Sequence, residues 1–117
     1  MPESFEPLNM PFSTADAELP LLTYEDGHLR VTFLDWREQD VILRFQGVAA
    51  FSWDGGDALC SDAHRNDTSY TVAGSDWLHK LLGLGEITAS EGHRHFKLCF
   101  NAVGVLQVIS TCLEVLT

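Results

Sequence analysis

Two histidines, His93 and His95, are the first residues whose type and spacing suit chemistry. They flank Arg94, and side chains two apart on a strand lie on the same face, a spacing that metal sites use. Lys97 continues that face and its positive charge disfavours a divalent metal, while the local sequence supplies no third ligand except Cys99. We therefore predict no metal site and keep His93 and His95 only as weak candidates. A solvated or hydrogen-bonded histidine face is favoured.

The carboxylates of residues 54–69 form a second group of potential ligands, in a segment with turn composition and no periodicity. Hard cations such as calcium prefer oxygen ligands. Four aspartates lie in this segment: Asp54, Asp57, Asp62 and Asp67. Their spacing lacks the alternating positions and the distant glutamate of a calcium-binding loop. A solvated loop is favoured, but long loops in compact domains often bind ligands, so the segment stays a candidate binding loop.

Nucleophilic catalysis would need a serine or cysteine placed against a histidine and a carboxylate. Cys60 with His64, and Cys99 with His95, are candidate pairs, but neither lies in a supporting motif such as G-x-S-x-G. Cys99 and Cys112 lie within strand patterns, where small buried side chains are favoured. We predict no catalytic residue and no cofactor. A small-molecule-binding or hydrolytic domain that uses the long loop and the nearby histidines stays open as an alternative.

Trp36 and Trp53 give the remaining signal, because each follows a strand pattern and has acids beside it. A tryptophan among carboxylates suits a protein-binding patch, since tryptophan is enriched at the energetic centres of interfaces. The candidate partner-binding residues are Asp35, Trp36, Glu38, Asp40, Trp53, Asp54 and Asp57. Ordinary burial at the rim of the core is the alternative interpretation.

The charge of the chain restricts its partners. Its 117 residues carry a formal net charge of −10, which argues against binding to nucleic acid or to anionic membrane surfaces. Residues 1–62 hold 12 acids and three arginines, a charge of −9, whereas residues 63–117 hold five acids and four basic residues, a charge of −1. The acidic surface is therefore predicted to belong to the first half, and a basic protein is the partner that it favours.

The location of the protein follows from what the sequence does not contain. No run approaches the about 18 apolar residues of a membrane span, and the N-terminus has acids where a signal peptide needs basic residues. The three cysteines, Cys60, Cys99 and Cys112, show no CxxC spacing. We expect a cytoplasmic protein with reduced thiols.

Strand periodicity dominates the middle of the first half. Apolar and polar residues alternate over 28–36 and again over 41–46, and the polar residues 37–40 have the length of a hairpin loop. This pattern predicts an antiparallel pair. Residues 48–53 are expected to continue the second strand beyond a bend at Gly47.

The second half predicts one helix and a second hairpin. Ser75 offers an N-cap for a short amphipathic helix that ends near Gly83 and covers a sheet face. Alternation over 95–100 predicts a strand, and a turn over 101–104 leads into 105–116, which is apolar enough for a central strand.

These elements predict an α+β fold: a curled antiparallel β-sheet in the order β-β-β-α-β-β with one short covering helix, over residues 21–117 as a single domain. Residues 1–20 contain all four prolines and form a Pro-rich acidic N-terminal arm, either mobile or laid against the domain.

Short motifs of the second half resemble a known family. They are Ser75-Asp76-Trp77-Leu78, and His95-Phe96-Lys97-Leu98-Cys99-Phe100-Asn101 followed by Gly104 and Val108-Ile109. The chain resembles, over residues 28–116, a family of small bacterial proteins whose domain has no assigned function, some of which are grouped with immunity proteins of bacterial toxin systems. Ser110 stands where the family more often has Ala, and Gln107 stands where it more often has an acid. The resemblance implies the fold more than the function: it suggests an immunity-like role and gives no catalytic residues that could be transferred to this chain.

We therefore expect a non-enzymatic protein-interaction module whose acidic face meets a basic patch on a partner, as an immunity protein does when it blocks a nuclease. Whether the chain is an enzyme stays open. Two alternatives remain: a self-associating accessory protein that pairs sheet edges as a homodimer, and the small-molecule-binding or hydrolytic domain described above.

Overall fold

The computed structural model describes residues 3–55, 68–100 and 103–116. The elements in chain order are β1 (Ser4–Pro7), β2 (Leu21–Glu25), β3 (His28–Leu34), β4 (Asp40–Gln46), β5 (Ala50–Gly55), β6 (Ser69–Ala73), α1 (Asp76–Gly83), the 3₁₀ turn η1 (Ala89–Glu91), β7 (Arg94–Phe100), β8 (Gly104–Ser110) and β9 (Cys112–Val115). The fold is thus mostly antiparallel β-sheet with one short helix, in agreement with the predicted α+β class.

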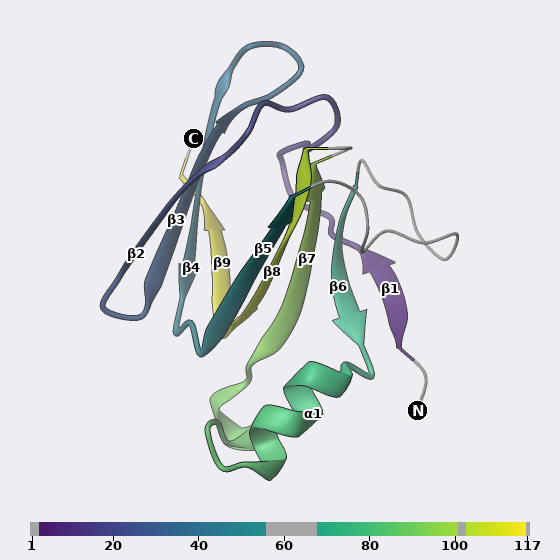
Figure 1. The fold of residues 1–117 in the computed structure, drawn as a ribbon, viewed down its shortest axis with the longest axis vertical. Helices are drawn as coiled ribbons and strands as arrows, with labels where there is room; N and C mark the ends of the chain where they lie inside the picture. Colours follow the sequence, from purple (N-terminus) through teal and green to yellow (C-terminus); the bar gives the residue numbers. More distant parts are fainter. Residues whose placement is uncertain (1–2, 56–67, 101–102, 117) are drawn as a thin grey trace.

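The strands form two sheets that pack face to face (Figure 1). One sheet has the order β1-β6-β7-β8-β5 and the other has the order β2-β3-β4-β9, with antiparallel neighbours throughout. Their inner faces share one core, in which the rings of Phe45 and Phe96 lie 5.4 Å apart. The predicted single curled sheet is not confirmed, because the strands are divided between two layers.

Two of the places where the chain changes sheets, after β4 and after β8, are adjacent corners. Gly47 has a φ of +62° at the first corner, a conformation that glycine adopts at little cost. At the second corner the N–H and the hydroxyl of Thr111 both donate to the carbonyl of Gln46, at 3.0 Å each. Residues 48–53 therefore do not extend β4, and the predicted strand 105–116 is two strands in different sheets.

The two predicted hairpins are present, although only part of the second turn lies within the described residues. Leu29 pairs with Phe45 and Leu34 with Asp40 across β3 and β4, and both strands alternate between buried and solvent-facing side chains. β8 lies between β7 and β5, and six of its seven residues are buried. The prediction of a central strand is thus confirmed for residues 105–110.

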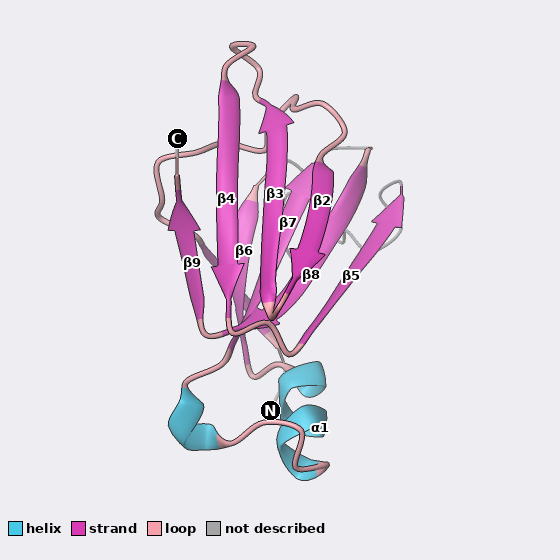
Figure 2. Ribbon diagram, turned by 90° about the vertical axis from the view of Figure 1, so that its left-hand side faces the viewer, coloured by secondary structure: helices cyan, strands magenta, loops and turns pink. Residues whose placement is uncertain are grey.

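Helix α1 begins where the sequence predicts, with Ser75 as its N-cap. It contains no buried residue and lies beyond one end of the strands (Figure 2). The prediction that it covers a sheet face is therefore not confirmed. Its attachment runs through Trp77, whose ring meets the imidazole of His95 edge-on with centroids 5.5 Å apart.

The N-terminal segment lies on the domain over its described residues. β1 pairs with β6 at the edge of the five-stranded sheet, and Leu8, Met10 and Phe12 pack against the core. Ala17 is buried within the core. Among the described residues, no helix has the length and apolar character needed to cross a membrane.

Candidate functional site

The turn between β3 and β4 carries three of the predicted partner-binding residues, a fourth begins β4, and Asp35 determines the shape of the turn. The Asp35 carboxylate is buried and accepts the N–H groups of Arg37 at 2.9 Å and Gln39 at 3.0 Å. The Arg37 guanidinium donates to its second oxygen at 3.0 Å. The hydrogen bond from Gln39 above all, aided by Arg37, holds the pKa of Asp35 below its ordinary value against the opposing effect of desolvation. Asp35 is thus an internal organiser of the turn and not a contact residue.

Trp36 follows Asp35 and stands in solvent, with 60% of its surface exposed. The guanidinium of Arg37 lies 5.6 Å from the centre of its ring, within the range of a cation–π contact. Because Asp35 also holds Arg37, the same ion pair that fixes the turn also fixes the group stacked on the tryptophan. The exposed indole is therefore attached to a turn whose backbone is held by the contacts of Asp35.

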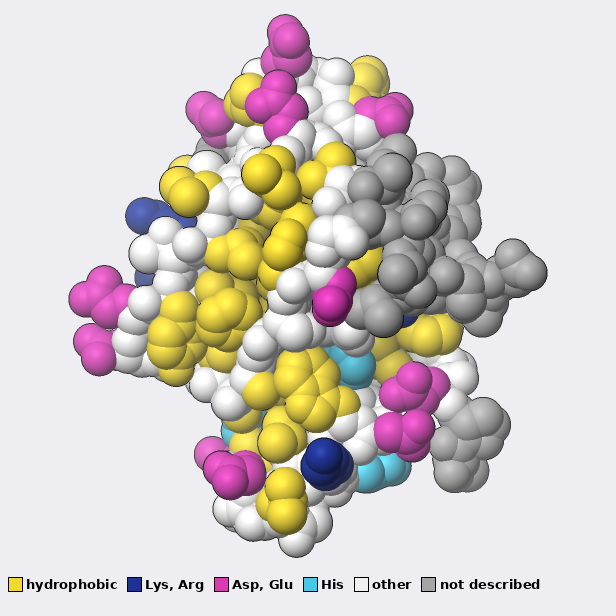
Figure 3. Space-filling model, in the orientation of Figure 1, with side chains coloured by type: hydrophobic (Ala, Val, Ile, Leu, Met, Phe, Trp, Pro, Cys, Tyr) yellow, Lys and Arg dark blue, Asp and Glu magenta, His cyan; other side chains and the backbone are white. Residues whose placement is uncertain are grey.

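Glu38 in the turn and Asp40 at the start of β4 are both exposed. Glu38 has a φ of +59°, a left-handed conformation that costs free energy for a residue with a side chain. The four charged residues from Asp35 to Asp40 carry three negative charges and one positive charge, a net −2. Figure 3 shows acidic side chains at the end of the molecule where Figure 1 places this turn.

Trp53 and Asp54 lie at the same end of the sandwich but play different parts. The Trp53 ring packs at 5.8 Å from Phe100, which in turn meets Phe33 at 5.1 Å, just before the turn. Trp53 is thus a half-buried core residue, and Asp54 after it is exposed. The seventh predicted residue, Asp57, lies outside the described residues.

The acids of the first half do not converge on one surface. Glu25 and Asp26 lie at the β2–β3 turn, whereas Glu38 and Asp40 lie at the β3–β4 turn, at the opposite end of β3. β3 has seven residues, so the two groups are about 20 Å apart. This is well beyond the about 8 Å over which exposed charges act at physiological salt. The acidic half therefore presents separate clusters.

The predicted histidine face has a different chemistry from a metal site. Both nitrogens of His95 are occupied: Nδ1 lies 2.7 Å from the hydroxyl of Ser75, and Nε2 lies 2.8 Å from Oε1 of Gln107. Lys97 on the same face is also buried, with its ammonium 4.9 Å from the ring centre of Phe5. Within residues 3–55, 68–100 and 103–116, no three His, Cys, Asp or Glu side chains are grouped as metal ligands.

The side chains of Ser75 and His95 are in contact, but this contact supports the fold and does not form a catalytic pair. The Ser75 hydroxyl is buried, accepts the N–H of Leu78 at 3.1 Å as the helix cap, and is hydrogen-bonded to Nδ1 of His95. A hollow of about 340 Å³ beside them includes His93 and His95 in its lining but not Ser75. Cys99 is fully buried. The pair Cys60 and His64, with most of the 54–69 loop, lies outside the described residues, so the hydrolytic alternative stays a prediction.

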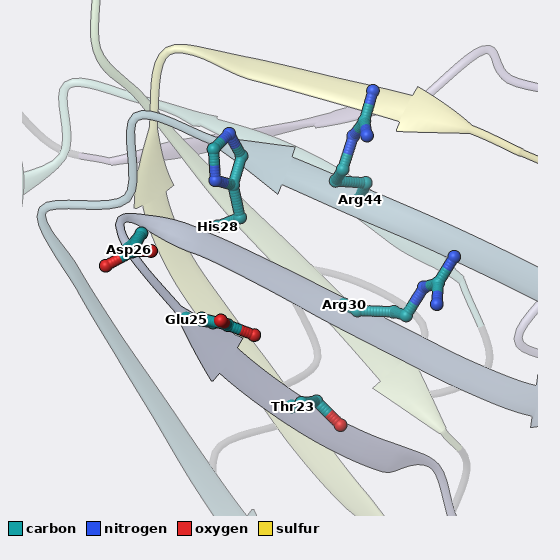
Figure 4. A pocket seen from close by; sticks show the side chains of 6 residues that line it. All are labelled: Thr23, Glu25, Asp26, His28, Arg30 and Arg44. Carbon is teal, nitrogen blue, oxygen red and sulfur yellow. The ribbon is translucent and has the colours of Figure 1, made fainter.

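A pocket on the outer face of the four-stranded sheet was not predicted from the sequence. It is lined by Thr23, Glu25, Asp26, His28, Arg30 and Arg44, and has a volume of about 360 Å³ (Figure 4). Arg30 and Arg44 are directly opposite each other in the β3–β4 pair. The hairpin register could have revealed this pair, because a turn over 35–39 places the two arginines opposite each other on the solvent-facing side.

Comparison with known proteins adds no relative. A scan against protein-family models, a search of curated proteins and a search of solved structures each found no match.

Proposed function

We propose that this protein is a non-enzymatic protein-interaction module that presents the β3–β4 turn to a basic partner protein. The observation that carries the proposal is Trp36, which is 60% exposed on a turn that the buried Asp35 carboxylate holds in place. A large aromatic side chain exposed at a turn gives the folded monomer little packing energy, whereas at an interface it would be buried.

Order in the turn favours binding. Association loses the conformational freedom of every side chain and loop that becomes fixed, and a turn that is already fixed avoids much of that loss. Asp35 accepts two backbone N–H groups and the Arg37 guanidinium, so the backbone below Trp36 is ordered before any partner arrives.

The charge around Trp36 indicates the sign of the partner surface. Glu38 and Asp40 are exposed beside it, and Asp54 is exposed at the same end of the sandwich. A basic patch would be attracted to this end, which speeds encounter and makes binding sensitive to salt. The acids at the β2–β3 turn are too distant to contribute to the same contact.

This role is compatible with the expected immunity-like function in a bacterial cytoplasm. The partner would then be a protein with a basic active site, such as a nuclease domain whose phosphate-binding surface is covered by the acidic turn.

The test is affinity capture from the native cell with matched variants. Immobilised wild type, Trp36→Ala and Glu38→Gln/Asp40→Asn would be compared with Glu25→Gln/Asp26→Asn, which removes the same charge at the other end of β3. We expect one basic protein to be retained by the wild type and by the β2–β3 variant, and to be lost with Trp36→Ala and with Glu38→Gln/Asp40→Asn. Capture of no protein, or equal capture by all four, would contradict the proposal.

Self-association is a second candidate, supported by the edge strands β2 and β5. These strands end their respective sheets, and the rings of Tyr24 and Phe51 lie 5.5 Å apart between them. Leu21 is 67% exposed and Tyr24 50% exposed, and Figure 3 shows hydrophobic side chains in the region between the two strands. Unpaired edges beside exposed apolar side chains favour pairing with a second copy. Light scattering across concentration would detect a homodimer, and Tyr24→Lys should abolish it.

A further inference from the structure

The pocket on the outer face of β2, β3 and β4 has opposite charges at its two ends. Thr23, Arg30 and Arg44 form one row across the three strands, and Glu25 and His28 form the next row. Asp26 follows Glu25 in the turn. Neighbouring rows on one face of a strand are about 7 Å apart. In Figure 4 both arginine side chains rise on the same side of the sheet, with Glu25 and Asp26 toward the turn.

The arginine end contains an unfavourable pairing. Arg30 is directly opposite Arg44, and like charges in that relation destabilise a sheet. Arg44 has a counter-ion, since one of its terminal nitrogens lies 3.1 Å from Glu114. Arg30 has no hydrogen-bond or ion-pair partner among the described residues. One guanidinium of the pair is therefore unneutralised.

Arg44 adds a second unsatisfied group. Its Nε is buried and has no hydrogen-bond partner among the residues that the structure describes, although its terminal nitrogen pairs with Glu114. A buried donor without an acceptor costs free energy. A carboxylate placed between the two arginines would neutralise Arg30 and offer an acceptor to the exposed part of the Arg44 guanidinium.

The acidic end determines what else such a ligand carries. Glu25 and Asp26 are exposed and make no ion pair within the described part of the chain. Together with Glu114 they would repel a simple anion, because the five charged groups around the pocket sum to −1. A ligand that carries a positive group toward this end removes the repulsion.

We propose that this pocket binds a small zwitterion of the amino-acid type, with its carboxylate on Arg30 and Arg44 and its ammonium group toward Glu25 and Asp26. The planar guanidinium matches a carboxylate through paired hydrogen bonds, and the carboxylates match an ammonium group as a point charge. This site is separate from the β3–β4 turn, so neither proposal depends on the other.

The experiment is a titration of the ¹⁵N-labelled full chain, followed by NMR of the backbone amides and the arginine Nε–H groups. The probe is 4-aminobutyrate, and butyrate and butylamine at matched ionic strength are the single-charge controls. We expect saturable shifts of Arg30, Arg44 and the β2–β3 amides with 4-aminobutyrate, and at least about tenfold weaker binding of either control compound, as when a charge-assisted contact is lost.

Variants at each end separate the two contacts. Arg30→Gln and Glu25→Gln/Asp26→Asn should each weaken binding of 4-aminobutyrate about tenfold, whereas Lys80→Gln on α1 should leave it unchanged. Shifts that stay linear with concentration, or wild-type affinity in Arg30→Gln, would overturn the site. Equal affinity for butyrate and 4-aminobutyrate would show that the ammonium group makes no contact, and would overturn the proposal that the ligand is a zwitterion.

Discussion

The hydroxyl oxygen of Ser75 lies 2.7 Å from Nδ1 of His95, and this contact joins the helix to the five-stranded sheet. Oε1 of Gln107 can only accept, so Nε2 of His95, 2.8 Å away, carries the imidazole proton. Nδ1 of the neutral ring then accepts from the Ser75 hydroxyl, which itself accepts the N–H of Leu78. The hydrogen bonds among Ser75, His95 and Gln107 therefore form a network that connects the start of α1 to β7 and β8, with a neutral imidazole at its centre.

Ser75→Ala should destabilise the protein by about 2–4 kcal/mol. The change removes the N-cap of α1, which contributes about 1 kcal/mol, and it leaves the buried Nδ1 of His95 without a donor, which costs about 1–3 kcal/mol. Urea denaturation measures the loss. Ser4→Ala, at an exposed position of β1, is the control and should stay within about 0.5 kcal/mol of wild type. Equal stability of the two variants would show that the hydrogen bonds of Ser75 contribute nothing to the free energy of unfolding.

Stability should fall as the pH drops below about 6.5 because of His95. Desolvation lowers the pKa of His95 from its ordinary 6.5, although the hydrogen bond to Gln107 opposes this. The unfolded chain then binds more protons than the folded chain in the interval below 6.5, so the stabilisation is present above that pH and is lost as the pH falls. Denaturation at about pH 7.5 and about pH 5.5 should show a smaller difference for His95→Gln than for wild type. Equal pH dependence in the two proteins would exclude His95 as the cause.

Local signals in the sequence predicted the elements that local contacts form. The alternation over 28–46 gave the β3–β4 hairpin, and Ser75 before an apolar stretch gave the helix start. The two-sheet arrangement was not predictable in this way, because it depends on Thr111 bonding the carbonyl of Gln46, a contact between residues 65 positions apart. In the local sequence, only Gly47 indicates the corner after β4.

The sequence did not distinguish the environments of the two candidate tryptophans. Trp36 and Trp53 look alike in sequence, since both follow strand patterns beside acids. Trp53 is in register with Leu106 and faces the core, whereas Trp36 lies in a turn beyond the last pair of β3, Leu34 with Asp40. Pairing register thus separates a core residue from an exposed one.

Gly47→Ala should be more destabilising than Gly27→Ala. Both glycines have positive φ, +62° and +78°, so both substitutions have a backbone cost of about 1–2 kcal/mol. A Cβ at Gly47 would also collide with the side chain of Thr111, whereas nothing lies within 4 Å of one at Gly27. Overpacking adds about 1–3 kcal/mol at Gly47 alone. The measurement is the difference in unfolding free energy between the two variants.

A double variant identifies the cause of that difference. Thr111→Ala removes the colliding side chain, so Gly47→Ala should cost less in its presence than in wild type. Additive effects of the two substitutions would mean that the corner relaxes without contact between these residues.

Trp53→Ala and Trp36→Ala should have opposite profiles of stability and binding. Trp53 packs on Phe100 within the core, so its loss should cost about 2 kcal/mol or more. Trp36 is 60% exposed, so its loss should change stability by no more than about 0.5 kcal/mol. If the turn binds a partner, Trp36→Ala weakens that binding at unchanged stability, because the indole has its main contacts in the complex. Denaturation of both variants, with capture of the partner by each, measures the two quantities. A large loss of stability in Trp36→Ala would instead show that the exposed ring supports the turn.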